Sequence, residues 1–250
     1  MNTKLYVAGH KSFAAPYDDI YVPIIGGMEK HKHNPELKNF LGDNTGDNIS
    51  LLNPNFCELT VHYWIWKNDT QSEVVGLNHY RRLYAKKHHG TNLFFKYLDD
   101  KKIVIEGQEI ASGQDFDFSD LDMIVPQRWR LDSALKQYGD AHHLEDMFLI
   151  GEQIKKYQSD YMDAFNFFIN HCNYFHHTNM IVARKEVFDK YSSWLFSLLF
   201  PLVDKKFYSR YRDGQERVFG YLAERLLSVW LLKNRENLRI DERPWVPIEE

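Results

Sequence analysis

Residues 73–84, with the sequence EVVGLNHYRRLY, constrain the fold more than any other stretch of this chain. The stretch begins with an apolar run, VVGL, which is typical of a strand covered on both faces. It ends in the polar and cationic run NHYRR. Open α/β sheets form ligand sites where buried strands present polar side chains at their carboxyl ends. The adjacent Arg81 and Arg82 indicate an anionic ligand, with phosphate as the first candidate.

The composition is that of a globular protein with a large core. The chain has 250 residues, of which 44% are hydrophobic and 15% aromatic, so intrinsic disorder is unfavourable. Its formal net charge of −4 argues against a general nucleic-acid binder. Cys57 and Cys172 have no metal-binding or redox spacing, which predicts buried free thiols in a reducing compartment.

No stretch of the sequence has the pattern of a membrane-spanning segment. The first residues, MNTKLYVAGHK, lack the profile of a signal peptide, and every apolar window is too short to cross a bilayer. We therefore expect a cytoplasmic protein. The locally basic segment 81–102 has two interpretations: a solvated loop, or a peripheral contact with the inner face of the cytoplasmic membrane.

Two polar stretches in the first fifth of the chain are candidate ligand contacts. Residues 4–8 read as a strand, followed by Gly9, His10 and Lys11, which could meet a phosphate or could form an ordinary turn. Residues 15–35 are predicted to be mostly loop with one short helix. The near-repeat GDNTGDN at 42–48 predicts either consecutive Asx-turns or a loop that holds a ribose, a sugar hydroxyl or a hard cation.

The remaining elements alternate between strands and helices. Asn53 and Pro54 predict the start of a buried helix over 53–68, in which Glu58 and His62 share a face and either pair or line a site. Further strands are expected at 121–126 and 174–183, and a hairpin at 102–110. Helices are expected at 93–98, 132–138, 142–157, 159–171, 185–205 and 215–233. This alternation without a linker predicts one α/β domain spanning residues 1–250.

Two further clusters could carry chemistry. On the last helix Arg217, Tyr221, Glu224 and Ser228 form one polar stripe, which indicates either an internal Arg–Glu pair or a face turned to a cleft. In HHLED at 142–146 the order of residues does not match a zinc motif. Asp146 or Glu145 could be an acid–base group there, and an acidic first helical turn explains the same residues without chemistry.

Several common catalytic motifs are missing from the sequence. It has no P-loop, GxGxxG, GxSxG or kinase motif, and no Asp-x-Asp at the end of an apolar strand. Such an Asp-x-Asp is the usual metal-holding device of enzymes that use nucleotide sugars. His79, Tyr80, Arg81 and Arg82 occupy that kind of position here, and arginines can neutralise a leaving diphosphate without a divalent ion.

The sequence resembles a bacterial family described as a domain of unknown function, DUF4422. The resemblance covers essentially the whole chain and includes KLYVAGHK, LGDNTGDNIS, NPNFCELTVHYWIWKN, VVGLNHYRRLY, HHLEDM, NMIVARKEVFDKYSSWLF and RVFGYLAERLLSVWL. Family members occur in capsular polysaccharide, exopolysaccharide and O-antigen gene clusters and are regarded as glycosyltransferases, some of them galactofuranosyltransferases. The resemblance implies a single GT-A-like domain with a mixed, mostly parallel sheet flanked by helices and a helical C-terminal part.

The resemblance also implies a reaction and its partners. The implied enzyme transfers a hexose, with galactose or galactofuranose and a UDP carrier as first candidates, to a growing and lipid-linked glycan. We expect inversion at the anomeric carbon, although a retaining reaction is compatible with the same phosphate contacts. The alternative is a non-catalytic sugar- or nucleotide-binding assembly subunit. Partners are then the nucleotide-sugar donor and the glycan acceptor, with no nucleic acid.

Residues can be assigned to each role from their positions in the sequence. The predicted catalytic carboxylates are Asp146 and Glu224. The predicted donor contacts are His10, Lys11, Asp43, Asp47, Asn48, Asn78, His79, Arg81, Arg82 and Arg217. The predicted acceptor or sugar contacts are His142, His143, Glu145, Asn179 and Tyr221. We expect no required cofactor; if manganese or magnesium is needed, Asp43 and Asp47 are its predicted ligands.

Overall fold

The centre of the structure is a nine-stranded sheet in which EVVGLNH supplies one of the inner strands. The computed structural model describes residues 1–14, 16, 18–86 and 109–248. The order of the sheet is β10-β6-β9-β4-β1-β2-β3, with β5 pairing with both β4 and β11. The strands are β1 (Thr3–Gly9), β2 (Tyr21–Ile25), β3 (Leu41–Gly42), β4 (Val74–His79), β5 (Arg82–Tyr84), β6 (Met123–Pro126), β9 (Ile181–Arg184), β10 (Ile240–Arg243) and β11 (Trp245–Pro247).

The pairing is mixed but mostly parallel, which confirms the predicted fold class. β1 pairs in parallel with β2 and β4, β2 with β3, and β6 with β10. β9 is the inserted antiparallel strand, between β4 and β6. Gly76 of β4 lies where a Cβ would come within 2.7 Å of the Leu5 side chain and 2.8 Å of Val182, so both neighbouring strands approach it closely.

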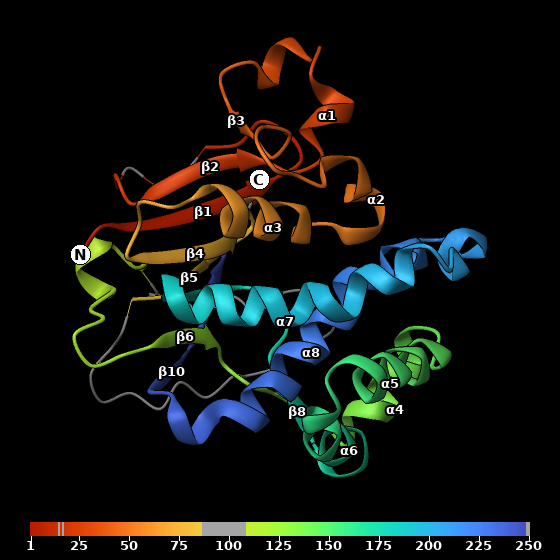
Figure 1. Cartoon of the computed structure of the whole chain (residues 1–250). Coiled ribbons are helices and arrows are strands. Elements are labelled where there is room, and N and C mark those ends of the chain that lie inside the picture. Colours follow the sequence, from red (N-terminus) through yellow and green to blue (C-terminus); the bar gives the residue numbers. More distant parts are fainter. Residues whose placement is uncertain (15, 17, 87–108, 249–250) are drawn as a thin grey trace.

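Helices cover one face of the sheet and extend beyond one end of it (Figure 1). The helices are α1 (Met28–His31), α2 (Asn53–Phe56), α3 (Leu59–Asn68), α4 (Ala134–Ala141), α5 (Glu145–Tyr157), α6 (Met162–His171), α7 (Lys185–Val203) and α8 (Val218–Asn234). α3 and α7 both contact β4, and α4, α5 and α6 group together at one end. The larger core lies between these helices and the sheet; a smaller one lies on the opposite face, around Leu5, Val7 and Val182.

Three sequence predictions about elements were wrong, and each has a local cause. Residues 15–35 contain β2, which was missed because Pro23 within it argues against a strand beside two partners. The helix expected over 53–68 is broken at Cys57, whose φ is 52°. The strand expected over 174–183 is interrupted between β8 (Tyr174–Phe175) and β9, because Thr178 and Asn179 have φ values of 83° and 52°.

Some predictions lie outside the described residues. These are the helix at 93–98, nearly all of the hairpin at 102–110, and most of the basic residues of segment 81–102. Within the residues that the structure does describe, no helix combines the length and apolar character needed to cross a membrane.

His62 is a core residue rather than a partner of Glu58. It is 1% exposed, its ring stacks on Phe188 with 4.5 Å between ring centroids, and its Nε2 lies 2.8 Å from Ser192 Oγ. Burial lowers the pKa of His62 to about 3, so the ring is neutral in the folded protein at pH 7.

This burial predicts a loss of stability in mild acid. In the unfolded chain His62 takes up a proton below its ordinary pKa of 6.5, whereas in the folded protein it stays neutral down to about pH 3. The unfolded state therefore gains free energy from protonation between these pH values, and the stability of the fold decreases as the pH falls from 6.5 toward 3. Between pH 7.5 and 5.5 the free energy of unfolding should fall by about 1.4 kcal/mol more in the wild type than in His62→Phe. Urea unfolding at both pH values measures this difference. Equal losses in the two proteins would show that His62 is protonated in the folded state.

Candidate anion-binding cleft

The topology brings four distant segments to one edge of the sheet. β1 and β4 are parallel, so their carboxyl ends, at Gly9 and His79, lie together. β9 runs antiparallel to β4, which places the residues before it at the same edge. The α2–α3 junction and the beginning of α8 complete this edge, because α2 packs against α8. Polar residues that are far apart in the sequence therefore face a common space.

Two cavities occupy this space and share one wall. The β1 cavity, of about 460 Å³, is bordered by Ala8, Gly9, His10, Gly26, His31, Asn53, Pro54 and Glu216. The α8 cavity, of about 340 Å³, is bordered by Arg82, Trp129, Gln137, His142, Phe175, His177, Thr178, Gly220, Tyr221, Glu224 and Arg225. Both are also lined by Cys57, Glu58, His79, Arg81 and Arg217. We call these five residues the shared wall and the two cavities together the cleft.

The shared wall and its surroundings carry three arginines against one wall carboxylate: Arg81 and Arg217 belong to the wall, Arg82 lies beside it in the α8 cavity, and the carboxylate is Glu58. His79 is surrounded by Arg82, Arg81, His10 and Arg217, and burial together with these neighbours lowers its pKa to about 3. Burial and the nearby Arg81 also lower the pKa of Arg82. Positive groups that oppose one another's charge are stabilised by an anion, so the wall has the electrostatic character of a phosphate or diphosphate site. Of the two arginines predicted from the sequence as donor contacts, Arg81 lines both cavities and Arg82 lines the α8 cavity.

Glu224 also lines the α8 cavity. Its Oε1 accepts a hydrogen bond from the Thr178 N–H at 2.8 Å, and its Oε2 accepts one from Arg225 at 2.9 Å. Its side chain is 21% exposed. Burial raises the pKa of Glu224, against the opposing effect of Arg225. A fixed carboxylate with a raised pKa at the edge of a cavity is suited to act as a general base.

Glu58 is a second carboxylate of the cleft, which the sequence left undecided between pairing and site. Its Oε1 accepts a hydrogen bond from the side-chain amide of Asn179 at 2.7 Å, and the same amide donates to the Gly220 carbonyl at 3.0 Å. Asn179 itself is buried, and its hydrogen bond fixes the position of the Glu58 carboxylate. Cys57, Thr178 and Asn179 all have positive φ. This backbone conformation is unfavourable for residues other than glycine, and residues that adopt it are often found at functional sites.

The thiol of Cys57 is protonated at neutral pH. Burial raises its pKa to about 12, and its Sγ accepts a hydrogen bond from Arg217 Nε at 3.1 Å. Cys57 is only partly buried, in contrast to the sequence prediction, while Cys172 is buried as expected. We therefore regard Cys57 as a group that positions Arg217 rather than as a nucleophile.

Aromatic rings form much of the α8 cavity. His142 stacks on Tyr221 with 3.9 Å between ring centroids, and its Nδ1 lies 3.0 Å from Gln215 Oε1. His177 packs edge-on against Trp129 at 5.5 Å. The stripe predicted on the last helix therefore faces the cleft through Arg217, Tyr221 and Glu224. Its fourth member, Ser228, is buried and bonds to His176 instead.

The loop 42–48 has a structural role in the described residues. Asp43 is fully buried and accepts hydrogen bonds from the N–H groups of Gly27 (2.8 Å) and Met28 (3.0 Å) and from Ser50 Oγ (2.5 Å). Asp47 accepts one from the Tyr63 hydroxyl at 3.1 Å, and Asn48 forms an Asx-turn with Ser50 N. None of these three predicted donor contacts lines the cleft. Only Asn48 forms an Asx-turn, whereas Asp43 and Asp47 accept hydrogen bonds from residues outside the loop, so neither sequence alternative describes the whole loop.

The predicted catalytic residue Asp146 is likewise not placed for chemistry. It is 1% exposed, and its two carboxylate oxygens accept hydrogen bonds from the hydroxyls of Tyr211 (2.7 Å) and Tyr138 (3.2 Å). A carboxylate enclosed by two tyrosines cannot reach a substrate hydroxyl, so we correct its assignment to a structural one. His142 and Asp146 also do not share a helix face, because α4 ends before His142 and α5 begins at Glu145.

Four other predicted contacts lie away from the cleft. Lys11 is exposed and does not line either cavity. Asn78 is buried in β4, and its side chain has no hydrogen-bond partner among the described residues. His143 and Glu145 border a shallow hollow near Tyr211.

The described residues contain no group of three or more His, Cys, Asp and Glu side chains arranged to hold a metal ion. Asp43 and Asp47, the predicted ligands, do not fit a metal site. The oxygens of Asp43 are already occupied by buried N–H and hydroxyl donors, and Asp47 lies in the same structural loop, bonded to Tyr63.

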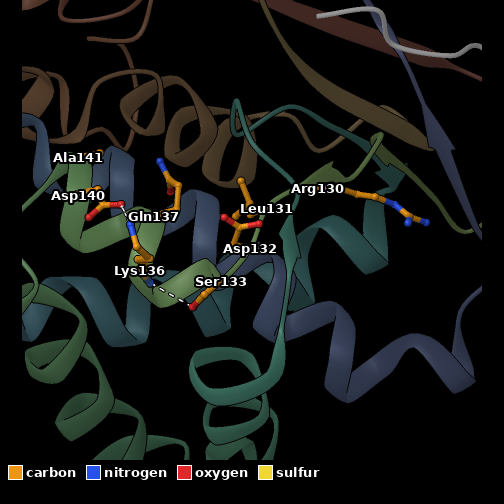
Figure 2. Close-up of a pocket in the computed structure, with 8 residues that line it drawn as sticks. All are labelled: Arg130, Leu131, Asp132, Ser133, Lys136, Gln137, Asp140 and Ala141. Atoms are coloured by element: carbon orange, nitrogen blue, oxygen red, sulfur yellow. Dashed lines mark hydrogen bonds and ion pairs between the residues drawn. The ribbon is translucent and has the colours of Figure 1, made fainter.

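A wider hollow of about 600 Å³ lies beside the cleft at the start of α4 (Figure 2). Two of its charged side chains pair with each other, since the Lys136 ammonium group bonds to Asp140. The backbone N–H of Lys136 donates a hydrogen bond to Ser133 Oγ. Gln137 separates the hollow from the α8 cavity and accepts a hydrogen bond from Arg225 at 2.6 Å. We therefore assign the functional site to the cleft.

Several residues of the cleft were not predicted from the sequence: Cys57, Trp129, Gln137, His177, Thr178 and Arg225. The polar stretch HHTN before an apolar strand was a usable signal for His177 and Thr178. The others follow apolar or helical patterns, which do not distinguish a cavity wall from a core.

The fold and this cleft define an α/β protein with an arginine-lined cleft at the carboxyl ends of parallel strands. A family model described as "Domain of unknown function (DUF4422)" matches residues 4–235, and the chain belongs to that family. A solved structure described as the WbbM bifunctional glycosyltransferase in its apo form superposes with a TM-score of 0.86 at 29% sequence identity. The match covers 100% of this chain and 46% of that one, so this chain spans about half the length of its neighbour. The GT-A-like fold is thereby confirmed. No curated protein matches the sequence.

The contacts of Asp43 predict a stability effect without a binding effect. Asp43→Ala should lower the free energy of unfolding by about 3 kcal/mol, because it leaves the buried N–H groups of Gly27 and Met28 without an acceptor. Urea unfolding measures this change, and Asp47→Ala, on the more exposed part of the loop, serves as the matched control with a loss of about 1 kcal/mol or less. A stable Asp43→Ala protein that binds pyrophosphate weakly would instead make Asp43 a ligand contact.

Proposed function

We propose that this protein is a glycosyltransferase that moves a hexose from a nucleotide diphosphate sugar to a hydroxyl of a growing bacterial surface polysaccharide. The single observation that carries the proposal is the shared wall between two cavities, which contains Arg81, Arg217 and Glu58 and has Arg82 and Glu224 beside it in the α8 cavity. Membership in the family and the likeness to a bifunctional glycosyltransferase support the same class of reaction.

The β1 cavity is suited to the nucleotide half of the donor. It lies at the carboxyl ends of β1 and β4, where open α/β sheets bind their ligands. Its lining includes the backbone of Gly9 and Gly26 and the side chains of His10 and Asn53, which can approach a ribose and a base closely. We take the nucleotide to be uridine, with galactose or galactofuranose as the sugar.

The shared wall would receive the diphosphate. Arg81 and Arg217 line both cavities and Arg82 lines the α8 cavity, so the three guanidinium groups surround the boundary where the sugar–phosphate bond would lie. Charge accumulates on the diphosphate oxygen as that bond breaks, and fixed cations stabilise the transition state more than the ground state. Arginines can supply this stabilisation without a metal ion.

The α8 cavity would hold the acceptor. Aromatic rings such as Trp129 and Tyr221 offer faces for the apolar side of a sugar ring, while Gln137 and Arg225 offer hydrogen bonds. In the proposed inverting step, Glu224 takes the proton of the acceptor hydroxyl as its oxygen bonds to the anomeric carbon. The electrons of the breaking carbon–oxygen bond remain on the leaving diphosphate. Glu58 would contact hydroxyls of the donor sugar at the shared wall.

The donor assignment predicts selective stabilisation by a nucleotide sugar. In a thermal-shift screen of UDP-, GDP-, dTDP- and CMP-linked sugars, UDP-linked hexoses should raise the melting temperature most, because a ligand that binds only the folded state stabilises it. Arg81→Ala should weaken the binding of that ligand roughly 10- to 100-fold, since it removes a charge-assisted hydrogen bond. Arg130→Ala, in the hollow beside the cleft, is the control that should bind normally. Equal binding by both variants would contradict a diphosphate at the shared wall.

The base assignment predicts a separation of catalysis from binding. Glu224→Gln should reduce kcat for sugar transfer, or for slow donor hydrolysis, by about 100-fold or more and leave donor affinity nearly unchanged. Asp146→Asn should lower the melting temperature but keep most of the activity per folded molecule, because Asp146 is enclosed by Tyr138 and Tyr211. If Glu58→Gln has the larger effect on kcat, Glu58 is the base. Donor binding without any hydrolysis or transfer would favour the non-catalytic assembly subunit.

A further inference from the structure

His79 occupies the centre of the shared wall, and its ring orientation is fixed. It is the last residue of β4, and the alternation of the strand directs it to the same side as Val75 and Leu77, toward the cleft. Its Nδ1 accepts a hydrogen bond from the backbone N–H of Arg81 at 3.2 Å. Its ring also packs against Tyr80, with 4.8 Å between centroids. The side chain is therefore held by two neighbours, and His79 lines both cavities.

This contact determines which nitrogen carries the ring proton. A backbone N–H can only donate, so Nδ1 must turn its lone pair toward Arg81. The proton of the neutral imidazole then resides on Nε2, which is the remaining polar atom of the ring. A second proton, on Nδ1, would oppose the Arg81 N–H and break the hydrogen bond between them.

The surrounding charges act in the same direction. His79 faces His10 from the end of β1, Arg81 and Arg82 from the β4–β5 turn, and Arg217 from the segment before α8. The carboxylate on the shared wall is Glu58, which is already bonded to Asn179. The guanidinium groups of Arg81, Arg82 and Arg217 disfavour a further positive charge on the ring.

We propose, resting on the proposed function, that His79 binds the donor diphosphate as a neutral hydrogen-bond donor through Nε2–H, and that the arginines alone supply the positive charge. The neutral ring adds a directed hydrogen bond to a diphosphate oxygen without adding to the repulsion among the cations. Because the ring does not titrate in the working range, its contribution to binding is the same on both sides of neutral pH.

The test uses inorganic pyrophosphate, a probe that does not depend on the identity of the nucleoside. Glutamine can place an amide N–H near the position of Nε2, whereas asparagine reaches only to the position of Nδ1. In calorimetric titrations at pH 8.0, His79→Gln should bind pyrophosphate within about threefold of the wild type. His79→Ala and His79→Asn should bind it roughly 10- to 100-fold more weakly, as expected for losing a hydrogen bond to a charged group.

A second measurement reports the charge of the ring directly. Titrations at pH 7.0 in two buffers of different ionisation enthalpy give the number of protons taken up on binding. Wild type and His79→Gln should take up the same number. One additional proton in the wild type would show that His79 binds as a cation and would overturn the inference, as would normal binding by His79→Ala. Thermal melts of each variant identify any loss of folding. Among folded variants, stronger pyrophosphate binding by His79→Gln than by His79→Asn supports a hydrogen bond from Nε2–H, and equal binding by the two contradicts it.

These outcomes are separable from the fate of the proposed function. If pyrophosphate binding follows the expected pattern but no nucleotide sugar is hydrolysed or transferred, the role of His79 stands and the transferase proposal fails. If transfer occurs and His79→Ala binds pyrophosphate normally, the transferase proposal stands and the role of His79 fails.

Discussion

Repulsion among like charges at the carboxyl ends of β1 and β4 is the constraint on which the rest of the structure depends. Arg81, Arg82 and Arg217 approach one neutral histidine, an arrangement that an isolated chain would not keep. It is maintained because β4 is an inner strand of the sheet, held between β1 and β9 and covered by α3 and α7. The hydrophobic burial of this strand and the helices over it opposes the repulsion, and an anionic ligand would relieve it.

Backbone conformations that are unfavourable for ordinary residues place the carboxylates of the cleft. The positive φ of Cys57 ends α2 and lets α3 begin in a new direction, which turns Glu58 toward the cleft. The positive φ values of Thr178 and Asn179 turn one N–H to Glu224 and one side-chain amide to Glu58. Strain at these three positions is thus coupled to the placement of two acidic groups of the cleft, Glu58 in the shared wall and Glu224 in the α8 cavity.

Division of the cleft by a shared wall gives the two cavities different chemistry. The β1 cavity is bordered by small residues such as Gly9 and Gly26 together with polar and charged ones, whereas the α8 cavity is bordered by aromatic rings and by Arg225, which lies 4.3 Å from the Phe175 ring centre. Two cavities with different linings suit two different substrates, here the proposed donor and acceptor, that react at the sugar–phosphate bond between them. The solved neighbour carries a chain about twice as long, so this fold can function as one part of a larger protein.

The sequence by itself determined the α/β class, the central strand and its cationic end, and the polar stripe of α8, because hydrophobic periodicity and strand-end polarity are local patterns. It also indicated an Asx-turn at Asn48 but not the buried contacts of Asp43 with Gly27 and Met28. The tertiary structure decided that Asp146 is enclosed by Tyr138 and Tyr211 and that Glu58 faces the cleft while His62 joins the core. A buried carboxylate and a catalytic one look alike in sequence, since only the packing of distant segments decides which of them meets solvent.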